Sequence, residues 1–377
     1  MTTPPPGGWL PQQPGQPPHG RPQYGPPQNQ FQPSAGYPAG YPFGQQPPPP
    51  PKGNSIKWLL VGIAVLLVLG LTIGATLLFT RENDRDQSAS PMPSNIASAG
   101  DTGPISVVAE EPTCSTLNGI NRTVAGVEAN GWGAQRGSLG PKAEWTSEQI
   151  SQVDAVATAM RNATAQVMKL SEQTPHRVIR ELYLQYAAYG MAYVNSLDSY
   201  EPKDNYLADV NVSIGNAMLG ICNAIEFGSA SRAVAVEGVD GPTSPEVAPT
   251  DADVPERFLT SPNSACTAWV QREQAFVAST SEWEKMDPEV PGSSWSADQK
   301  AIQNAAFSTF STLADESESA GRATGNPQFE DFAVLSAVYA RAYAASGQSY
   351  VGADSWLSYT SLRLMNTVSG ACQAAAE

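Results

Sequence analysis

Few side chains of this chain are of the types that carry out catalysis. Outside the first 100 residues there is one histidine, His176, and it follows a Thr-Pro pair typical of an exposed helix start. The four cysteines have spacings that suit disulfide bonds, which would leave no thiolate nucleophile and no Cys/His set for zinc. The chain contains no phosphate-binding glycine loop, no GxSxG turn and no HExxH helix. The sequence therefore predicts no catalytic residue, no metal ligand and no cofactor.

Carboxylates are the remaining candidates for chemistry, since the chain has 36 of them. Asp204 and Asp354 recur at the same point of two similar segments, each just before an expected helix. A carboxylate there caps free N–H groups and interacts favourably with the helix dipole, so a structural role is expected. No other pair of acidic residues stands out. A carboxylate-dependent hydrolase acting on envelope polymers is kept as the second alternative function.

The sequence pattern of the elements that would position these residues occurs twice in the chain. YGMAYVNSLDSY, from Tyr189, returns 150 residues later as YARAYAASGQSY. The same shift superposes tryptophan, aspartate, glycine and cysteine positions, without a gap, from Trp145 through Cys222. The region is therefore predicted to be a duplicated domain.

Each copy has the pattern of four helices. WTSEQ and WSADQ are capping boxes in which Thr146 and Ser296 begin a helix, and Thr-Pro or Asn-Pro begins the next one. Leu182, Tyr186 and the tyrosines that follow recur every three or four residues, which places them on one helix face. The predicted fold class is all-α, with two tandem four-helix-bundle-like domains after a disordered tail and one transmembrane helix.

The cysteines fall at the start of the first helix and the end of the fourth helix in each copy. In an up-down-up-down bundle those two points lie at the same end. The predicted disulfides are therefore Cys114–Cys222 and Cys266–Cys372, with bonds between the copies as the alternative.

The repeated tyrosines have two interpretations. Tyrosine offers a large apolar body and a polar tip, which suits a binding groove, whereas the same helical spacing also suits core packing. The candidate binding face consists of Tyr189, Tyr193, Tyr200, Tyr339, Tyr343 and Tyr350.

The N-terminal part differs in composition from the rest. The first 51 residues hold 18 of the 33 prolines and no acidic residue, which predicts a disordered tail. WLLVGIAVLLVLGLTIGATLLF then runs for 22 residues without a charge, enough for a membrane-spanning helix and too long for a cleaved signal peptide. A signal anchor is predicted, and the paired cysteines favour an oxidising compartment for the part that follows.

These patterns predict the following organisation: a Pro/Gly/Gln-rich cytoplasmic tail (1–55), a transmembrane helix (56–80), a stalk (81–111), helical repeat 1 (112–226), a linker (227–263) and helical repeat 2 (264–377).

Charge indicates which partners the chain can have. All 36 acidic residues and 18 of the 21 basic residues follow Thr80, so this part carries a net charge of −18. Such a surface repels phosphate backbones, which argues against nucleic acid as a partner. An envelope protein or ligand is the expected partner, besides the membrane itself.

The tail, the PPPPPKG motif, the apolar segment and an Ala-rich C-terminal part together resemble the uncharacterised proline-rich single-pass membrane proteins of mycobacteria and related actinobacteria. The resemblance implies a plasma-membrane, cell-envelope location with the C-terminal domain outside, and no defined activity. The predicted function is a non-enzymatic envelope protein whose duplicated helical domain binds a partner or ligand. The first alternative is a transmembrane scaffold that acts through its proline-rich tail.

Overall fold

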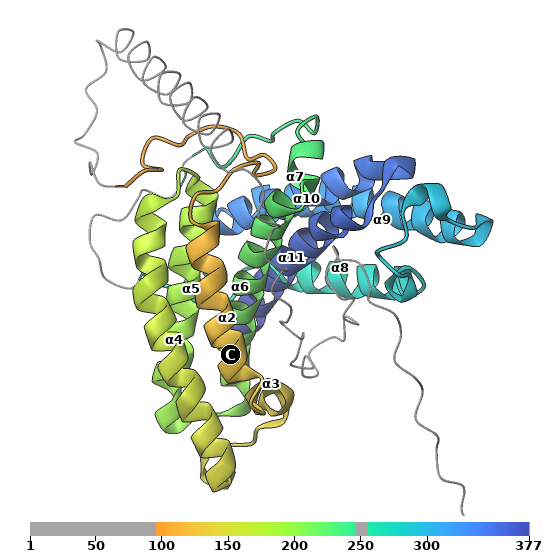
Figure 1. The fold of residues 1–377 in the computed structure, drawn as a ribbon. Coiled ribbons are helices and arrows are strands. Elements are labelled where there is room, and N and C mark those ends of the chain that lie inside the picture. Colours follow the sequence, from red (N-terminus) through yellow and green to blue (C-terminus); the bar gives the residue numbers. More distant parts are fainter. Residues whose placement is uncertain (1–95, 244, 246–254, 377) are drawn as a thin grey trace, which may run out of the picture.

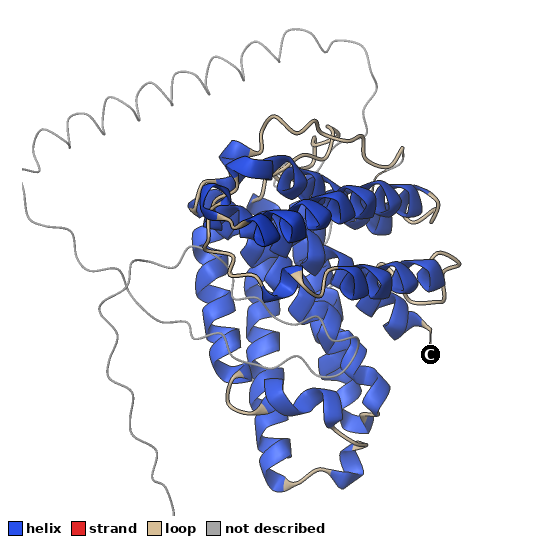
Figure 2. Cartoon of the chain, turned by 90° about the vertical axis from the view of Figure 1, so that its right-hand side faces the viewer, coloured by secondary structure: helices blue, strands red, loops and turns tan. Residues whose placement is uncertain are grey.

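The computed structural model describes residues 96–243, 245 and 255–376, and within them every regular element is helical (Figure 2). The one β-type pairing there is an isolated antiparallel bridge between Ile105 and Val239. The all-helical prediction is therefore confirmed for this part of the chain.

Repeat 1 and repeat 2 each contain four long helices that pack around a core, with short helices between them (Figure 1). In repeat 1 these are α2 (Cys114–Glu128), α4 (Ser147–Gln173), α5 (Arg177–Ser196) and α6 (Asn205–Glu226). Their counterparts in repeat 2 are α8 (Cys266–Ser279), α9 (Ala297–Arg322), α10 (Pro327–Ser346) and α11 (Ser355–Ala375). The short elements are α3 (Trp132–Gln135), η1 (Arg136–Ser138), η2 (Lys142–Glu144), η3 (Leu197–Ser199), η4 (Pro202–Asp204), α7 (Ser229–Arg232), η5 (Trp283–Lys285), η6 (Gly292–Ser294), η7 (Gly347–Ser349) and η8 (Gly352–Asp354).

The expected helix starts are present with one difference. Thr146 and Ser296 cap α4 and α9 through complete capping boxes, and Asn326 caps α10 with proline at its first position. In repeat 1 the corresponding helix α5 begins only at Arg177, beyond the Thr-Pro pair. The reason is that the hydroxyl of Thr174 donates to Glu111 at 2.6 Å and accepts the N–H of His176, so it closes a turn instead of capping the helix.

Both predicted disulfides are confirmed. Cys114 bonds to Cys222 and Cys266 to Cys372, with Cα–Cα distances of 5.4 and 5.3 Å. Each bond joins the start of the first long helix of a repeat to the last helix, so it closes the ring of four helices at one end.

The two repeats meet mainly along α6 and α11, which lie at the centre of Figure 1. A Cβ on Gly220 would lie 2.5 Å from Thr360 Oγ1, and a Cβ on Gly370 would lie 3.0 Å from Val210 Cγ2. Gly220 and Gly370 are equivalent in the two repeats, as are Val210 and Thr360. The helices therefore cross in opposite directions about a local pseudo-twofold axis, and a glycine permits the close approach on each side.

We expect Gly220→Val to lower the free energy of unfolding by about 1–3 kcal/mol, because the added methyl groups overpack the contact with Thr360. The control is Gly126→Val in α2, where a Cβ meets no atom within 4 Å and little loss is expected. Chemical denaturation of the two variants provides the measurement. Equal losses would contradict the close approach of α6 and α11.

The expectation of a transmembrane helix is corrected. Residues 56–80, like the tail 1–55, lie outside the described residues, and in the described ranges no helix is long and apolar enough to cross a bilayer. The long helices that are described, such as α4, bury one face and expose polar residues on the other. The predictions of a single-pass signal anchor and of a plasma-membrane location are therefore not supported, and the membrane as a partner stays a prediction.

The described parts of the expected stalk and linker pack on the helices. Ile105, Val107 and Val108, within the segment assigned to a stalk, are buried in the core. Phe258, within the segment assigned to a linker, packs edge-on against Tyr189 of α5 and Phe332 of α10. Both segments thus contribute to the contact between the repeats.

Candidate functional site

The six tyrosines of the predicted binding face lie inside the protein. Each is at most 4% exposed, and burial raises the pKa of every one of them, that of Tyr193 to about 12. They are therefore neutral side chains of the core, in agreement with the core-packing interpretation. The six are Tyr189, Tyr193, Tyr200, Tyr339, Tyr343 and Tyr350.

The second and third tyrosine of each repeat contact tryptophans. Trp132 donates its indole N–H to the hydroxyl of Tyr193 at 3.0 Å, and Trp283 does the same to Tyr343 at 2.8 Å. Tyr200 and Tyr350 pack against Trp145 and Trp295, with ring centroids 5.0 and 5.4 Å apart. The repetition of the tyrosines thus preserves a Trp–Tyr core in both copies.

The first tyrosine of each repeat contacts the segment that leads into the other repeat. Tyr189 of repeat 1 donates to the carbonyl of Leu259, which precedes repeat 2. Tyr339 of repeat 2 accepts the N–H of Val108, which precedes repeat 1. Each leading segment is therefore held by the partner repeat, and the two copies are joined by exchanged contacts.

The other residues considered for chemistry have structural contacts. Asp354 is buried, accepts the N–H of Val351 at 2.9 Å and pairs with Arg232 at 3.2 Å. Asp204 accepts the N–H of Glu201 at 2.9 Å. His176 contacts the carbonyl of Glu110 through Nε2 at 2.8 Å. In the described residues, no group of three or more His, Cys, Asp or Glu side chains is placed to hold a metal ion.

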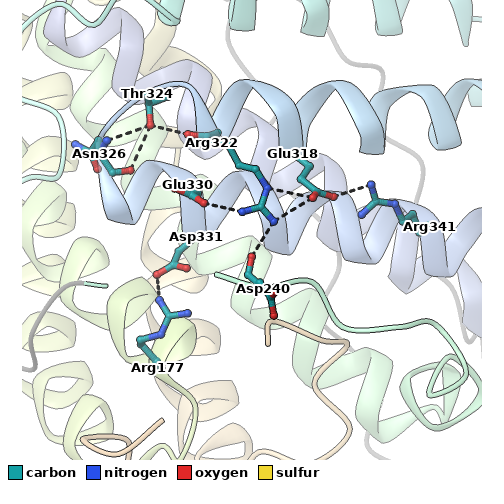
Figure 3. Close-up of polar contacts among 10 residues, drawn as sticks. Arg177, Asp240, Glu318, Arg322, Thr324, Asn326, Glu330, Asp331 and Arg341 are labelled. Atoms are coloured by element: carbon teal, nitrogen blue, oxygen red, sulfur yellow. Dashed lines mark hydrogen bonds and ion pairs between the residues drawn. The ribbon is translucent and has the colours of Figure 1, made fainter. Parts of the chain in front are cut away.

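The most unusual polar group of the described protein lies where α5 and α10 begin. Arg177, Arg180 and Glu181 of α5 meet Asp331 of α10, and none of the four is more than 4% exposed. Arg177 Nη1 forms an ion pair with Asp331 Oδ2 (Figure 3) and lies 3.7 Å from Glu181 Oε1. These four residues are called the junction cluster below.

The two carboxyls of the junction cluster are equivalent residues, because Glu181 and Asp331 are 150 positions apart. The two arginines have no such counterparts, since Pro327 and Glu330 occupy the matching positions. Sequence reasoning missed this group. The available signal was an acidic residue recurring at the same place in two largely apolar helices.

Burial disfavours the charged form of both carboxyls of the junction cluster. Burial raises the pKa of Glu181 well above its usual range, and the neighbouring Asp331 carboxylate raises it further, against the opposing effect of the arginines. Burial also raises the pKa of Asp331, whereas the hydrogen bond from Glu181 and the charge of Arg177 lower it. Neither Glu181 oxygen accepts a hydrogen bond from an N–H or O–H donor of the described residues. Glu181 is therefore the carboxyl of the pair whose charged form is the less favoured.

Two chain segments cover the junction cluster. Arg180 Nη1 donates to the carbonyl and the hydroxyl of Ser98, both at 3.0 Å, and Asp101 accepts the backbone N–H of Arg177 at 2.6 Å. On the other side, a Cβ on Gly241 would lie 2.5 Å from Arg177 Nη2 and 3.4 Å from Asp331 Oδ1. Residues 98–101 and 239–241 are called the covering segments below.

A second polar network, closer to the surface, holds one covering segment to repeat 2 (Figure 3). Arg322 pairs with Glu318 and Glu330, both at 3.1 Å, and donates to the carbonyl of Asp240 at 2.9 Å. Arg341 extends the network through Glu318 at 2.8 Å. Because Glu330 is next to Asp331 in α10, the network and the junction cluster share one helix start.

A pocket of about 490 Å³ lies away from the junction, between α8 and α9. In its lining, Arg272 pairs with Glu316 at 3.0 Å and lies over the ring of Trp269. The sequence analysis singled out none of its lining residues, which are Ala268, Gln271, Arg272, Asp315, Glu316 and Ser319.

Comparison with known proteins gives the family of this chain. The model of a family described as mycobacterial ESX-1 associated protein matches residues 96–377. The chain belongs to this family. The chain is also 39% identical over 353 residues to an uncharacterised protein of Mycolicibacterium smegmatis (strain MKD8), an alignment that covers 91% of this chain and 93% of the relative. No solved structure matches.

The matched range of the ESX-1 associated family spans both repeats and the covering segments. The expected resemblance to uncharacterised mycobacterial proteins is thus confirmed at the level of the family and the relative. Its proline-rich, single-pass layout has no support from these matches or from the described residues.

Proposed function

We propose that this chain is a non-catalytic protein of the ESX-1 secretion system whose two repeats together bind a protein partner. The family match supports the association with ESX-1. The observation that carries the binding role is the exchanged contact of Tyr189 and Tyr339, which joins both repeats into one unit. Such a unit presents two related surfaces in a fixed relative orientation, which suits recognition of a partner at two points.

The contacts of the polar side chains favour binding over catalysis. His176, Asp204 and Asp354 interact with the backbone, and the cysteines are oxidised. The buried carboxyls of the junction cluster lie under covering segments, where a substrate has no direct access. Catalysis usually needs a nucleophile or base aligned at a site that a substrate can enter.

The charge of the chain favours a basic partner surface. With a net charge of −18 beyond Thr80, complementary charge on the partner would speed association and select against acidic competitors. A complex of this kind weakens as salt screens the charges. We therefore expect its affinity to fall between low and physiological ionic strength.

The experiment is a complementation and crosslinking test in Mycolicibacterium smegmatis. The gene of the relative is deleted, and the strain receives this chain, the chain lacking residues 1–51, or the Gly220→Val variant. The amount of ESX-1 substrate in the culture medium and the proteins crosslinked to the tagged chain are measured. Glu148→Gln, an exposed substitution in α4, is the control.

We expect the full chain and the tail deletion to restore export and to crosslink to an ESX-1 component, and Gly220→Val to do neither. Unchanged export in the deletion strain, or no ESX-1 component above the untagged background, would refute the proposal. Loss of the partner on deletion of residues 1–51 alone would assign binding to the tail and contradict the role of the repeats.

A further inference from the structure

The charges around the junction cluster balance only when Glu181 holds a proton. From α5, Arg177 and Arg180 contribute two positive charges, and arginine stays protonated in proteins. Asp331 of α10 and Asp101 of the first covering segment contribute two negative charges. Ionisation of Glu181 would therefore add an uncompensated charge to a group that is 1% exposed.

The other charged groups nearby are already paired. Glu330 of α10 pairs with Arg322 of α9, and Asp240 of the second covering segment offers its carbonyl to the same arginine. No further cation among these contacts is available to neutralise an ionised Glu181. The cluster must then either keep its proton or admit water.

Water can reach the cluster only if the covering segments move. Val239 of the second segment bridges to Ile105, four residues beyond the first segment, with N–O distances of 2.7 and 2.8 Å. The first segment is held to the cluster by Arg177 and Arg180, through the contacts with Asp101 and Ser98. Opening the covering segments therefore breaks contacts to the same arginines that balance the two carboxyls.

We propose that Glu181 and Asp331 form a proton-dependent lock between the two repeats. With a proton on Glu181, the covering segments close over the junction cluster. When Glu181 loses the proton to water, its O–H bond breaks and two carboxylates lie beside Arg177. Their repulsion and their need for hydration open the covering segments. The inference is independent of the partner proposed above.

The direction of the pH dependence follows from the two states of Glu181. Its pKa is raised in the folded protein above the ordinary value of 4.5, so below that value both states hold the proton and pH has no effect. Above pH 4.5 the open or unfolded chain releases the proton while the closed protein keeps it. The closed state therefore becomes less stable as pH rises from about 5, and this continues until the folded pKa is reached. Asp331, also raised, acts in the same direction.

The experiment is hydrogen–deuterium exchange of the full chain at several pH values, corrected for the pH dependence of intrinsic exchange. For wild type, we expect the opening equilibrium in peptides that contain residues 98–101 and 239–241 to rise about tenfold or more from pH 5.5 to 7.5, since one proton changes it at most about tenfold per pH unit. In Glu181→Gln, which is a neutral donor at every pH, we expect the same peptides to stay protected across the range.

The control is Glu128→Gln, because burial raises the pKa of Glu128 to about 7 near Arg136, away from the junction. This variant should keep the pH-dependent opening of the covering segments. Wild-type protection that does not change with pH, pH dependence that persists in Glu181→Gln, or its loss in Glu128→Gln would each overturn the lock. If Glu181→Gln fails to fold, wild-type protection that does not change with pH still overturns the lock.

Discussion

Asp331→Ala is expected to lower the free energy of unfolding by about 3–5 kcal/mol, the largest effect of any single substitution considered. Removing the carboxylate leaves Arg177 buried without the Asp331 partner of its ion pair. Removing one partner of a buried ion pair destabilises a protein more than replacing both partners by apolar residues, because the remaining charge stays buried. Urea denaturation at pH 7, followed by circular dichroism, measures the change.

The matched control is Asp315→Ala, which removes an aspartate that is paired with Arg341 but is 77% exposed on α9. Exposed pairs contribute about 0–1 kcal/mol, so this variant should remain close to wild type. A double variant, Arg177→Leu with Asp331→Leu, removes both charges and is expected to recover part of the loss. A loss for Asp331→Ala as small as that for Asp315→Ala would show that the ion pair is not buried in solution.

Removal of one disulfide is expected to have the second large effect. Replacing Cys266 and Cys372 by serine opens a loop of more than 100 residues, with a sequence separation of 106. In the chain-entropy model this costs about 4–5 kcal/mol, less any strain released, and it should lower the melting temperature by roughly 10 °C. The Cys114→Ser, Cys222→Ser variant should lose a similar amount, because its loop has a separation of 108.

The measurement is thermal and chemical denaturation of the full chain with and without reductant. Wild type in reductant should approach the variant that lacks both disulfides, whereas the variant that lacks both should no longer respond to reductant. A wild-type protein that is equally stable in both conditions would contradict a stabilising role for the two disulfides.

Local patterns in the sequence were sufficient for much of the fold. The capping boxes at Thr146 and Ser296 mark helix starts because free N–H groups need acceptors within three residues. The 150-residue shift shows the duplication, and the cysteine positions in each copy are enough to pair the disulfides. In each case the information lies in residue types at fixed spacings, which can be read without knowing how the helices pack.

The apolar segment 56–80 was expected to span a membrane, and the described residues contain no such helix.

Other features depend on contacts between residues far apart in the chain. The tyrosines were weighed as a binding face, and their partners Val108 and Leu259 come from segments that sequence alone assigned to a stalk and a linker. The helical spacing of a side chain identifies a face but does not say what covers it.

The sequence by itself determined the helices, the duplication and the pairing of the cysteines, because the helix starts follow from local spacing and the other two follow from a pattern that recurs along the chain. Only the tertiary structure decided how the two copies join. Glu181 and Asp331 are separated by 150 residues and lie beside the same Arg177 side chain only when α5 and α10 meet under residues 98–101 and 239–241. The pKa of a carboxyl depends on burial and on the charges around it, and neither exists until the two repeats are packed together.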